Sequence, residues 1–250
     1  VKALSKWFAE GAFDGGASKI FWVGSEQDSE DASKYIPTLR TRGLGLPDRD
    51  DYLATSAKAV ELRERYHAYI EKLHELLGDD KAKATKGADL VLRIETELAK
   101  VTLDRVERRD PHKMFHPMSL AKLQALAPAI DWKAVFDAVG IKQTSRIDVT
   151  QPKFFERASA MLREEPLDVW KTWLRIKLVA QSAHLLSKPF VDEEFAFNGK
   201  YLRGAQSLRP RWKRCVEYTS DDLSEALAQL FVERNFAPDL KARAEKVLSG

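Results

Sequence analysis

The chain has 250 residues, of which 44% are hydrophobic and 32% charged, and its 41 basic side chains nearly balance 38 acidic ones. This composition is typical of a folded globular protein and excludes a mainly disordered chain. The net charge of +3 gives no concentrated basic surface for a nucleic acid or an acidic membrane, and no stretch approaches the roughly 20 apolar residues that cross a bilayer.

Two short strands are predicted near the N-terminus. Residues 20–23 and 35–39 are rich in β-branched and aromatic side chains, and the polar stretch between them is typical of a turn region. Pro37 has no N–H to donate, so the second strand is expected at an edge or at a bulge. We therefore expect a small β subregion over residues 18–42.

The hydrophobic pattern becomes helical from about residue 51, after a loop at 42–49 whose two glycines and proline interrupt regular structure. Apolar side chains then repeat every three or four residues in two long stretches, namely Leu62, Tyr66, Ile70, Leu73 and Leu77, and Val91, Ile94, Leu98 and Val101. Further helices are predicted at 119–127, 132–139, 152–164, 166–188, 211–235 and 239–248. The fold class expected is a mainly α, multi-helix lobe.

One further β signal lies around residues 195–202. Apolar residues alternate there about Asn198-Gly199, a pair typical of the type I′ turn of a hairpin because both of its central residues have positive φ. We predict a second hairpin at this point. With no repeat and no flexible linker, a single lobe over residues 1–250 is the simplest domain organisation.

The five histidines do not form a recognisable metal site. His74 begins a sequence like the helical zinc motif HExxH, but Gly78 stands where the second ligand is needed. His67 and His74 share a helix face about 10 Å apart, too far for two ligands of one ion. His112 and His116 have the right spacing, but two prolines bracket them and the lysine between them would repel a cation.

Other chemical motifs are also incomplete. The glycine-rich stretch 11–16 has the spacing of a phosphate loop, but Ala17 takes the place of its lysine. Gly43 and Gly45 lack the third glycine of a dinucleotide fingerprint. Cys215 is the lone cysteine, cannot form a disulfide within the chain, and has no neighbouring histidine to act as base. We therefore expect no catalytic residue and no metal ligand here, and assign no substrate-binding residue.

A series of short motifs nevertheless resembles one family in order along the chain. These are Gly43–Arg49 with Tyr52, Arg109–Pro111, Pro117–Leu120, Pro128 with Asp131-Trp132, Gln151-Pro152, Phe195–Phe197 with Gly199 and Gly204, Arg211–Cys215, and Phe231–Glu233 with Phe236. The chain resembles the N-terminal, non-catalytic region of the neprilysin and endothelin-converting-enzyme family of zinc metallo-endopeptidases. Departures are single loop substitutions: Arg42 replaces the usual glutamine, Asp51 an aromatic residue, and His116 an asparagine.

The resemblance implies a helical lobe that faces a C-terminal zinc-binding catalytic domain of the same parent chain, with zinc held there and no cofactor in this segment. It implies a chamber that admits short peptides, and an extracytoplasmic parent in which Cys215 has its partner elsewhere. Because the chain begins at Val1 and contains no HExxH, we expect a piece of a longer enzyme that is inactive alone. We also expect an apolar surface larger than the few hundred Å² usual for monomers.

Two other functions are considered. The chain could be a stand-alone helical module that binds peptides or proteins without protease activity. Alternatively, His112 and His116 could act as a metal pair together with distant carboxylates. An HExxH motif encoded after Gly250 would favour the lobe, and a stop codon there would favour the stand-alone module. The metal-pair alternative predicts a bound metal that is lost when both histidines are replaced by alanine.

Overall fold

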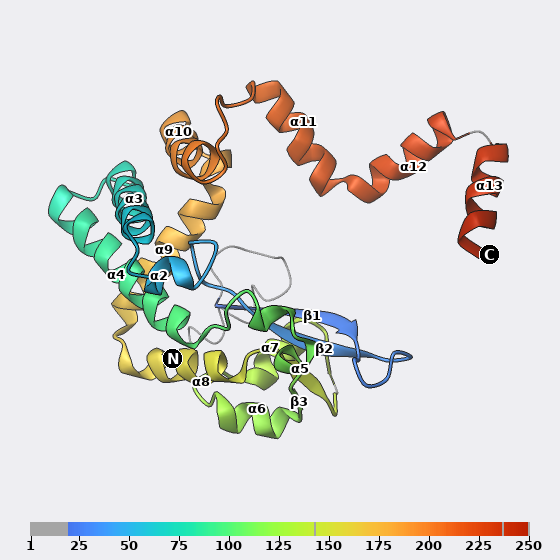
Figure 1. The fold of residues 1–250 in the computed structure, drawn as a ribbon, viewed down its shortest axis with the longest axis horizontal. Helices are drawn as coiled ribbons and strands as arrows, with labels where there is room; N and C mark the ends of the chain where they lie inside the picture. Colours follow the sequence, from blue (N-terminus) through green and yellow to red (C-terminus); the bar gives the residue numbers. More distant parts are fainter. Residues whose placement is uncertain (1–19, 143, 237, 250) are drawn as a thin grey trace. The chain divides into compact units, whose positions relative to one another are not determined.

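The computed structural model (Figure 1) describes residues 20–142, 144–236 and 238–249, and it confirms the mainly α fold with a small sheet near the N-terminus. The chain divides into two compact units, one that ends at Leu202 and one that begins at Arg203. They are called the first and the second unit below, and each is described by itself. That residues 1–250 make a single lobe stays a prediction.

A four-stranded sheet in the first unit contains both predicted strands. Its order is β1 (Phe21–Gln27), β2 (Tyr35–Thr41), β4 (Ile147–Val149) and β3 (Pro117–Met118). β1 and β2 are antiparallel and pair from Phe21 with Thr41 to Gln27 with Tyr35. β4 pairs with β2 in parallel and with β3 antiparallel.

The expectation that the second strand is an edge strand is wrong, because β2 lies between β1 and β4. Pro37 is tolerated because the parallel pairing with β4 involves only Thr38 and Leu39. Pro37 itself faces Ser25 of β1, so its missing N–H falls outside the short ladder to β4. The same pairing carries β1 three residues into the stretch predicted as a turn.

The two long amphipathic stretches form α3 (Ala57–Leu76) and α4 (Lys81–Val101), which lie side by side after the short α2 (Asp50–Leu53) (Figure 1). Ser56 and Asp80 cap their N-termini by accepting hydrogen bonds from the N–H groups of Ala59 and Lys83. Gly78, with φ of 89°, ends the first helix.

The remaining helices of the first unit are α5 (Pro111–Met114), α6 (Leu120–Leu126), α7 (Trp132–Ala138), α8 (Pro152–Glu164), α9 (Leu167–Ser182) and α10 (Lys188–Glu194), with 3₁₀ turns at Glu107–Arg109 and Ala183–Leu185. Among them, α6 to α9 follow the prediction, whereas α5 and α10 were not predicted. The predicted helix 166–188 therefore stops at Ser182 and continues only as a 3₁₀ turn.

The predicted hairpin at 195–202 is wrong. Phe195–Leu202 is a π-helix that directly continues α10, and neither Asn198 nor Gly199 has the positive φ of a type I′ turn. The physical reason is tertiary. Phe197 packs against α3, stacked on Tyr69 with ring centroids 4.9 Å apart, and this contact replaces cross-strand pairing.

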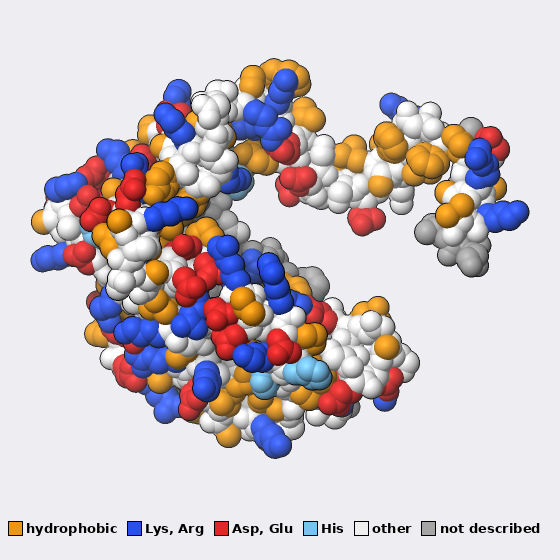
Figure 2. Space-filling view, in the orientation of Figure 1, with side chains coloured by type: hydrophobic (Ala, Val, Ile, Leu, Met, Phe, Trp, Pro, Cys, Tyr) orange, Lys and Arg blue, Asp and Glu red, His pale blue; other side chains and the backbone are white. Residues whose placement is uncertain are grey.

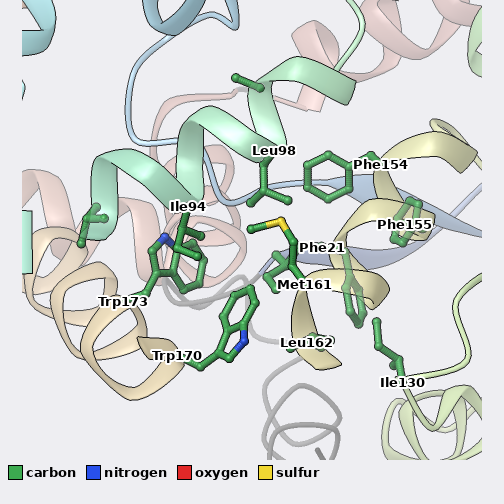
Figure 3. Packing of buried hydrophobic residues seen from close by; sticks show 14 of the residues in the cluster. Phe21, Ile94, Leu98, Ile130, Phe154, Phe155, Met161, Leu162, Trp170 and Trp173 are labelled. Atoms are coloured by element: carbon green, nitrogen blue, oxygen red, sulfur yellow. The ribbon is translucent and has the colours of Figure 1, made fainter. Parts of the chain in front are cut away.

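The core of the first unit lies where α4, α8, α9 and the sheet meet. Figure 3 shows Trp173 of α9 close to Ile94 of α4, and Phe154 of α8 near Leu98. On the sheet side, the ring of Phe21 lies 5.0 Å from that of Trp132, centroid to centroid. These side chains are fully or almost fully buried, and they fix the positions of the elements that carry the site described below.

The second unit contains α11 (Arg211–Asp222), α12 (Ser224–Asn235) and α13 (Pro238–Ser249). The single helix predicted at 211–235 is thus two helices, because the backbone leaves the helical conformation at Leu223, where φ is −114° and ψ is 23°. Neither α11 nor α12 has a buried residue. In the described part of the chain, no helix combines the length and apolar character that a membrane span requires.

Candidate functional site

The loop at residues 43–49 is anchored on the carboxylate of Glu95, which is fully buried on α4. Its Oε2 accepts a hydrogen bond from Tyr52 Oη at 2.6 Å and one from the N–H of Gly45 at 3.0 Å. Tyr52 Oη in turn accepts hydrogen bonds from the N–H groups of Gly45 and Leu46. Burial, reinforced by the Glu95 carboxylate, raises the pKa of Tyr52 well above its ordinary value, so its hydroxyl remains a donor.

A lysine and a second tyrosine complete the contacts of Glu95. Lys177 of α9, also buried, places Nζ 2.8 Å from Glu95 Oε1, and Tyr66 of α3 donates its hydroxyl to Oε2 at 3.0 Å. A Cβ at Gly45 would lie 1.9 Å from Tyr66 Oη. Glycine is therefore required there, because the loop backbone passes directly over this hydroxyl.

The far end of the loop is held by a second buried carboxylate. Asp48 accepts hydrogen bonds from Arg105 Nε at 2.7 Å, from Arg108 Nη2 at 2.9 Å and from the N–H of Asp50 at 3.1 Å. Burial alone would raise the pKa of Asp48, but these donors outweigh it and hold the pKa below its ordinary value of 3.8. Asp48 is therefore ionised at neutral pH and ties the loop to the residues that follow α4.

A cavity of about 550 Å³ lies beside this loop, entirely within the first unit. Cationic side chains and aromatic side chains both line it, the latter including Tyr69, Phe154 and Phe197. Arg49 donates to the carbonyl of Thr102 at 2.8 Å, which fixes the wall formed by the loop. The cavity can bind a ligand, but its described lining residues include no nucleophile paired with a general base.

The histidines considered in the sequence do not come together. His67 Nε2 lies 2.8 Å from Asp89 Oδ1, and buried His74 places Nδ1 2.8 Å from Asp79 Oδ2. His112 and His116 do not share a helix, since α5 ends at Met114. Among the described residues, no group of three or more His, Cys, Asp or Glu side chains could hold a metal ion. That the whole chain has no metal site stays a prediction.

The other candidate motifs also stay separate. The glycine stretch 11–16 lies outside the described residues. Gly43 and Gly45 belong to the anchored loop, where Gly43 has φ of 106°. Cys215 is a free, exposed thiol on α11.

Sequence reasoning missed Glu95 and Lys177. Both carried a readable signal: Glu95 follows Val91 by four residues on the apolar stripe of its helix, and Lys177 follows Trp173 by four residues on its own. A charged residue on a buried stripe needs a partner of opposite charge. The sequence does not say which partner, because these two residues lie 82 positions apart.

A second candidate surface is apolar and belongs to the second unit. Figure 2 shows hydrophobic side chains at the surface of its helices. Large apolar residues are exposed on all three, namely Trp212, Val216, Leu223, Leu227, Leu230, Phe231, Val232, Phe236, Leu240 and Val247. Leu227, Leu230 and Phe231 follow each other at helical spacing on α12 and so share one face. We call the ten exposed residues together the apolar surface.

Comparisons with known proteins agree on one family. The family model described as peptidase family M13 matches residues 2–250. Endothelin-converting enzyme 1 of Rattus norvegicus is 30% identical over 236 residues, which cover 92% of this chain and 31% of that protein. Neprilysin-3 of Drosophila melanogaster is 30% identical over 243 residues, with coverage of 92% and 30%. The chain thus spans about a third of the length of these relatives.

Solved structures show the same similarity. The zinc metalloprotease Zmp1 of Mycobacterium tuberculosis in its open state has a TM-score of 0.87 and 29% identity, covering 99% of this chain and 38% of that one. PepO of Lactobacillus rhamnosis, at 16% identity, has a TM-score of 0.78 over 99% of this chain and 39% of its own. At that identity the similarity is one of fold alone.

Proposed function

The chain belongs to peptidase family M13, and we propose that it is the non-catalytic helical lobe of a neprilysin-like zinc endopeptidase. In this role it bounds the chamber in which a second domain cleaves peptides, and it admits short peptides while excluding folded proteins. The observation that carries the proposal is the family match over residues 2–250 in relatives about three times as long. Zinc would supply an activated water and polarise the peptide carbonyl in the other domain.

The potential metal ligands of this chain support the proposal that the zinc is held by another domain. A catalytic zinc site needs three protein ligands within about 2.2 Å of one ion. His74, which begins the stretch similar to HExxH, is buried, and its Nδ1 lies 2.8 Å from Asp79 Oδ2. The main-chain N–H of His116 donates to Asp148 Oδ1 at 2.8 Å, and among the described residues His116 belongs to no group of three or more His, Cys, Asp or Glu side chains that could hold a metal. The described residues do not fit a catalytic zinc, so we assign no step of hydrolysis to them.

The apolar surface supports an attached domain. Exposed apolar side chains on three successive helices are unusual for a monomeric surface, because each fully buried side chain of this size gains about 1.5–3 kcal/mol when it leaves water. A covalently attached domain would cover these side chains permanently. The first unit buries a hydrophobic core of its own, and it too exposes some large apolar residues, among them Val106 and Leu185.

Size selectivity of the longer protein tests the role. The full-length peptidase is expected to cleave a peptide of about ten residues and to leave the same sequence intact in a surface loop of a folded protein, because the lobe keeps that protein from the zinc. Equal cleavage of both substrates would contradict the proposed role. The reading frame after Gly250 gives an independent check: a stop codon there would instead favour a stand-alone binding module.

An extracytoplasmic location for the longer protein is part of the same proposal. Cys215 is exposed, so its thiol can form a disulfide with a cysteine outside this segment in an oxidising compartment. Mass measurement of the non-reduced, full-length protein tests this pairing. A free Cys215 thiol in protein isolated from its natural location would contradict it.

A further inference from the structure

The cavity beside loop 43–49 has a lining rich in positive charge. Five cationic side chains line it, namely Arg40, Arg42, Arg49, Arg108 and Lys177, whereas Asp48 is the carboxylate among the described lining residues. A hollow of this kind, partly closed by low-dielectric walls, concentrates the field of its charges on a small bound ion. A cationic side chain is available to a ligand only if no carboxylate or carbonyl of the protein already binds it.

Most of these cations are already engaged by the protein. Arg40 pairs with Glu26 through two hydrogen bonds, Arg108 with Asp48, and Lys177 with Glu95. Arg49 donates to a main-chain carbonyl and lies 3.6 Å from an Asp50 oxygen.

Arg42 differs from the other four. Its guanidinium makes no hydrogen bond or ion pair with another residue in the described part of the chain, although the main-chain N–H of Arg42 donates to the Ile20 carbonyl. Arg42 is exposed where it lines the cavity, and a guanidinium without a partner among the described residues offers the planar pair of N–H donors that binds a carboxylate in a bidentate manner.

Aromatic side chains lie near Gly45, three residues after Arg42 on the same loop. At Gly45 the backbone passes over Tyr66, whose ring centroid is 5.7 Å from that of Phe197, and Phe197 is itself a lining residue. Three residues of chain span at most about 10 Å. Arg42 and Phe197 both line this one cavity, so a ligand inside it can meet a cationic group and an aromatic ring together.

From these positions we propose that the cavity is a binding site for a small amphipathic carboxylate, whose acid group pairs with the Arg42 guanidinium and whose aromatic or apolar part lies against Phe197. The site is separate from the proposed role of the lobe.

Calorimetric titration of the 250-residue chain tests the site with three probes. N-acetylphenylalanine carries both the acid and the ring, its amide carries the ring without the charge, and inorganic phosphate carries charge without the ring. The acid is expected to bind at least about tenfold more tightly than either of the others. Arg42→Gln is expected to weaken binding of the acid about tenfold or more, because the charged hydrogen-bond pair is lost.

The control is Lys86→Gln, which removes one positive charge from an exposed position on α4 that does not line the cavity. Its affinity for the acid should equal that of the wild type. Circular dichroism of each variant establishes that it is folded. The proposal is overturned if the acid does not bind at about 10 mM, if Arg42→Gln binds it as well as the wild type, or if phosphate or the amide binds equally well.

Discussion

Glu95 of α4 and Lys177 of α9 form an ion pair inside the core, with Oε1 and Nζ 2.8 Å apart and the glutamate fully buried. The same carboxylate holds the N–H of Gly45 and the hydroxyls of Tyr52 and Tyr66. One buried charge thus joins two helices to the glycine loop that bounds the cavity. The geometry of the loop therefore depends on this pair.

Replacing Glu95 by leucine is expected to lower the free energy of unfolding by about 3–5 kcal/mol, because the Lys177 ammonium is left buried without a counter-charge. Lys177→Met should lower the free energy of unfolding by a similar amount, because the Glu95 carboxylate is then buried without its counter-charge. The double variant should recover the part of the loss that comes from the unpaired charge, but not the part that arises because the Tyr52 and Tyr66 hydroxyls lose Glu95 as their acceptor. Urea unfolding measures all three. A double variant whose loss equals the sum of the two single losses would contradict the proposed coupling.

Gly87→Ala is expected to destabilise the chain by about 1–2 kcal/mol, although alanine is normally the better helix former by about 1 kcal/mol. The reason is steric: a Cβ at Gly87 would lie 2.3 Å from Nε2 of buried His74. The ring would have to move and would lose its contact with Asp79. Thermal unfolding compares the variant with wild type.

The matched experiment introduces Gly87→Ala into a chain that already carries His74→Ala. With the imidazole gone, the added methyl group has room, so the substitution should be neutral or stabilising by up to about 1 kcal/mol. An equal loss of stability in both backgrounds would show that the contact with His74 is not the cause.

Because of Asp48, the free energy of unfolding is expected to depend on pH in the acidic range. Its folded pKa lies below the ordinary value of 3.8, so the folded state favours the ionised form. The resulting stability is fully present above the unfolded pKa and is lost as the pH falls through the lower folded pKa. The difference in unfolding free energy between wild type and Asp48→Asn should therefore be constant above about pH 5 and shrink below about pH 4. A difference that stays constant to lower pH would contradict this account.

The periodic parts of the fold could be predicted from the sequence. The stripes of Leu62–Leu77 and Val91–Val101 define α3 and α4 because amphipathic helices bury one face, and that face is encoded locally. The family resemblance likewise rests on short local motifs. Both kinds of signal need only residues that are close in sequence.

The remaining features depend on contacts between distant residues. Asn198-Gly199 has strong turn chemistry, but the packing of Phe197 on Tyr69 keeps the segment helical. Pro37 suggested an edge, but the β4 strand that covers β2 comes from residues more than a hundred positions later. The cavity and the pairing of Glu95 with Lys177 likewise appear only once α3, α4 and α9 are packed together.

The apolar surface predicts a difference between the 250-residue chain and the full-length protein. Phe231 is 59% exposed, so Phe231→Glu should leave the melting temperature of the 250-residue chain nearly unchanged. In the full-length protein the same charge would be buried against the second domain, and the melting temperature should fall by several degrees.

Gln229→Glu is the control for that experiment, because it adds the same charge at an exposed position on the same helix, outside the apolar surface. It should change neither protein. Equal behaviour of Phe231→Glu and Gln229→Glu in the full-length protein would mean that the apolar surface does not contact another domain.

The central claim is that these 250 residues contribute walls to a peptidase and no reaction centre. The most direct test measures zinc content and peptide hydrolysis on the same purified sample of this chain, after washing with a chelator and dialysis against zinc. The account predicts far less than one zinc per chain and no cleavage of a short peptide above the uncatalysed rate. One zinc per chain, with hydrolysis that a chelator abolishes and added zinc restores, would contradict it.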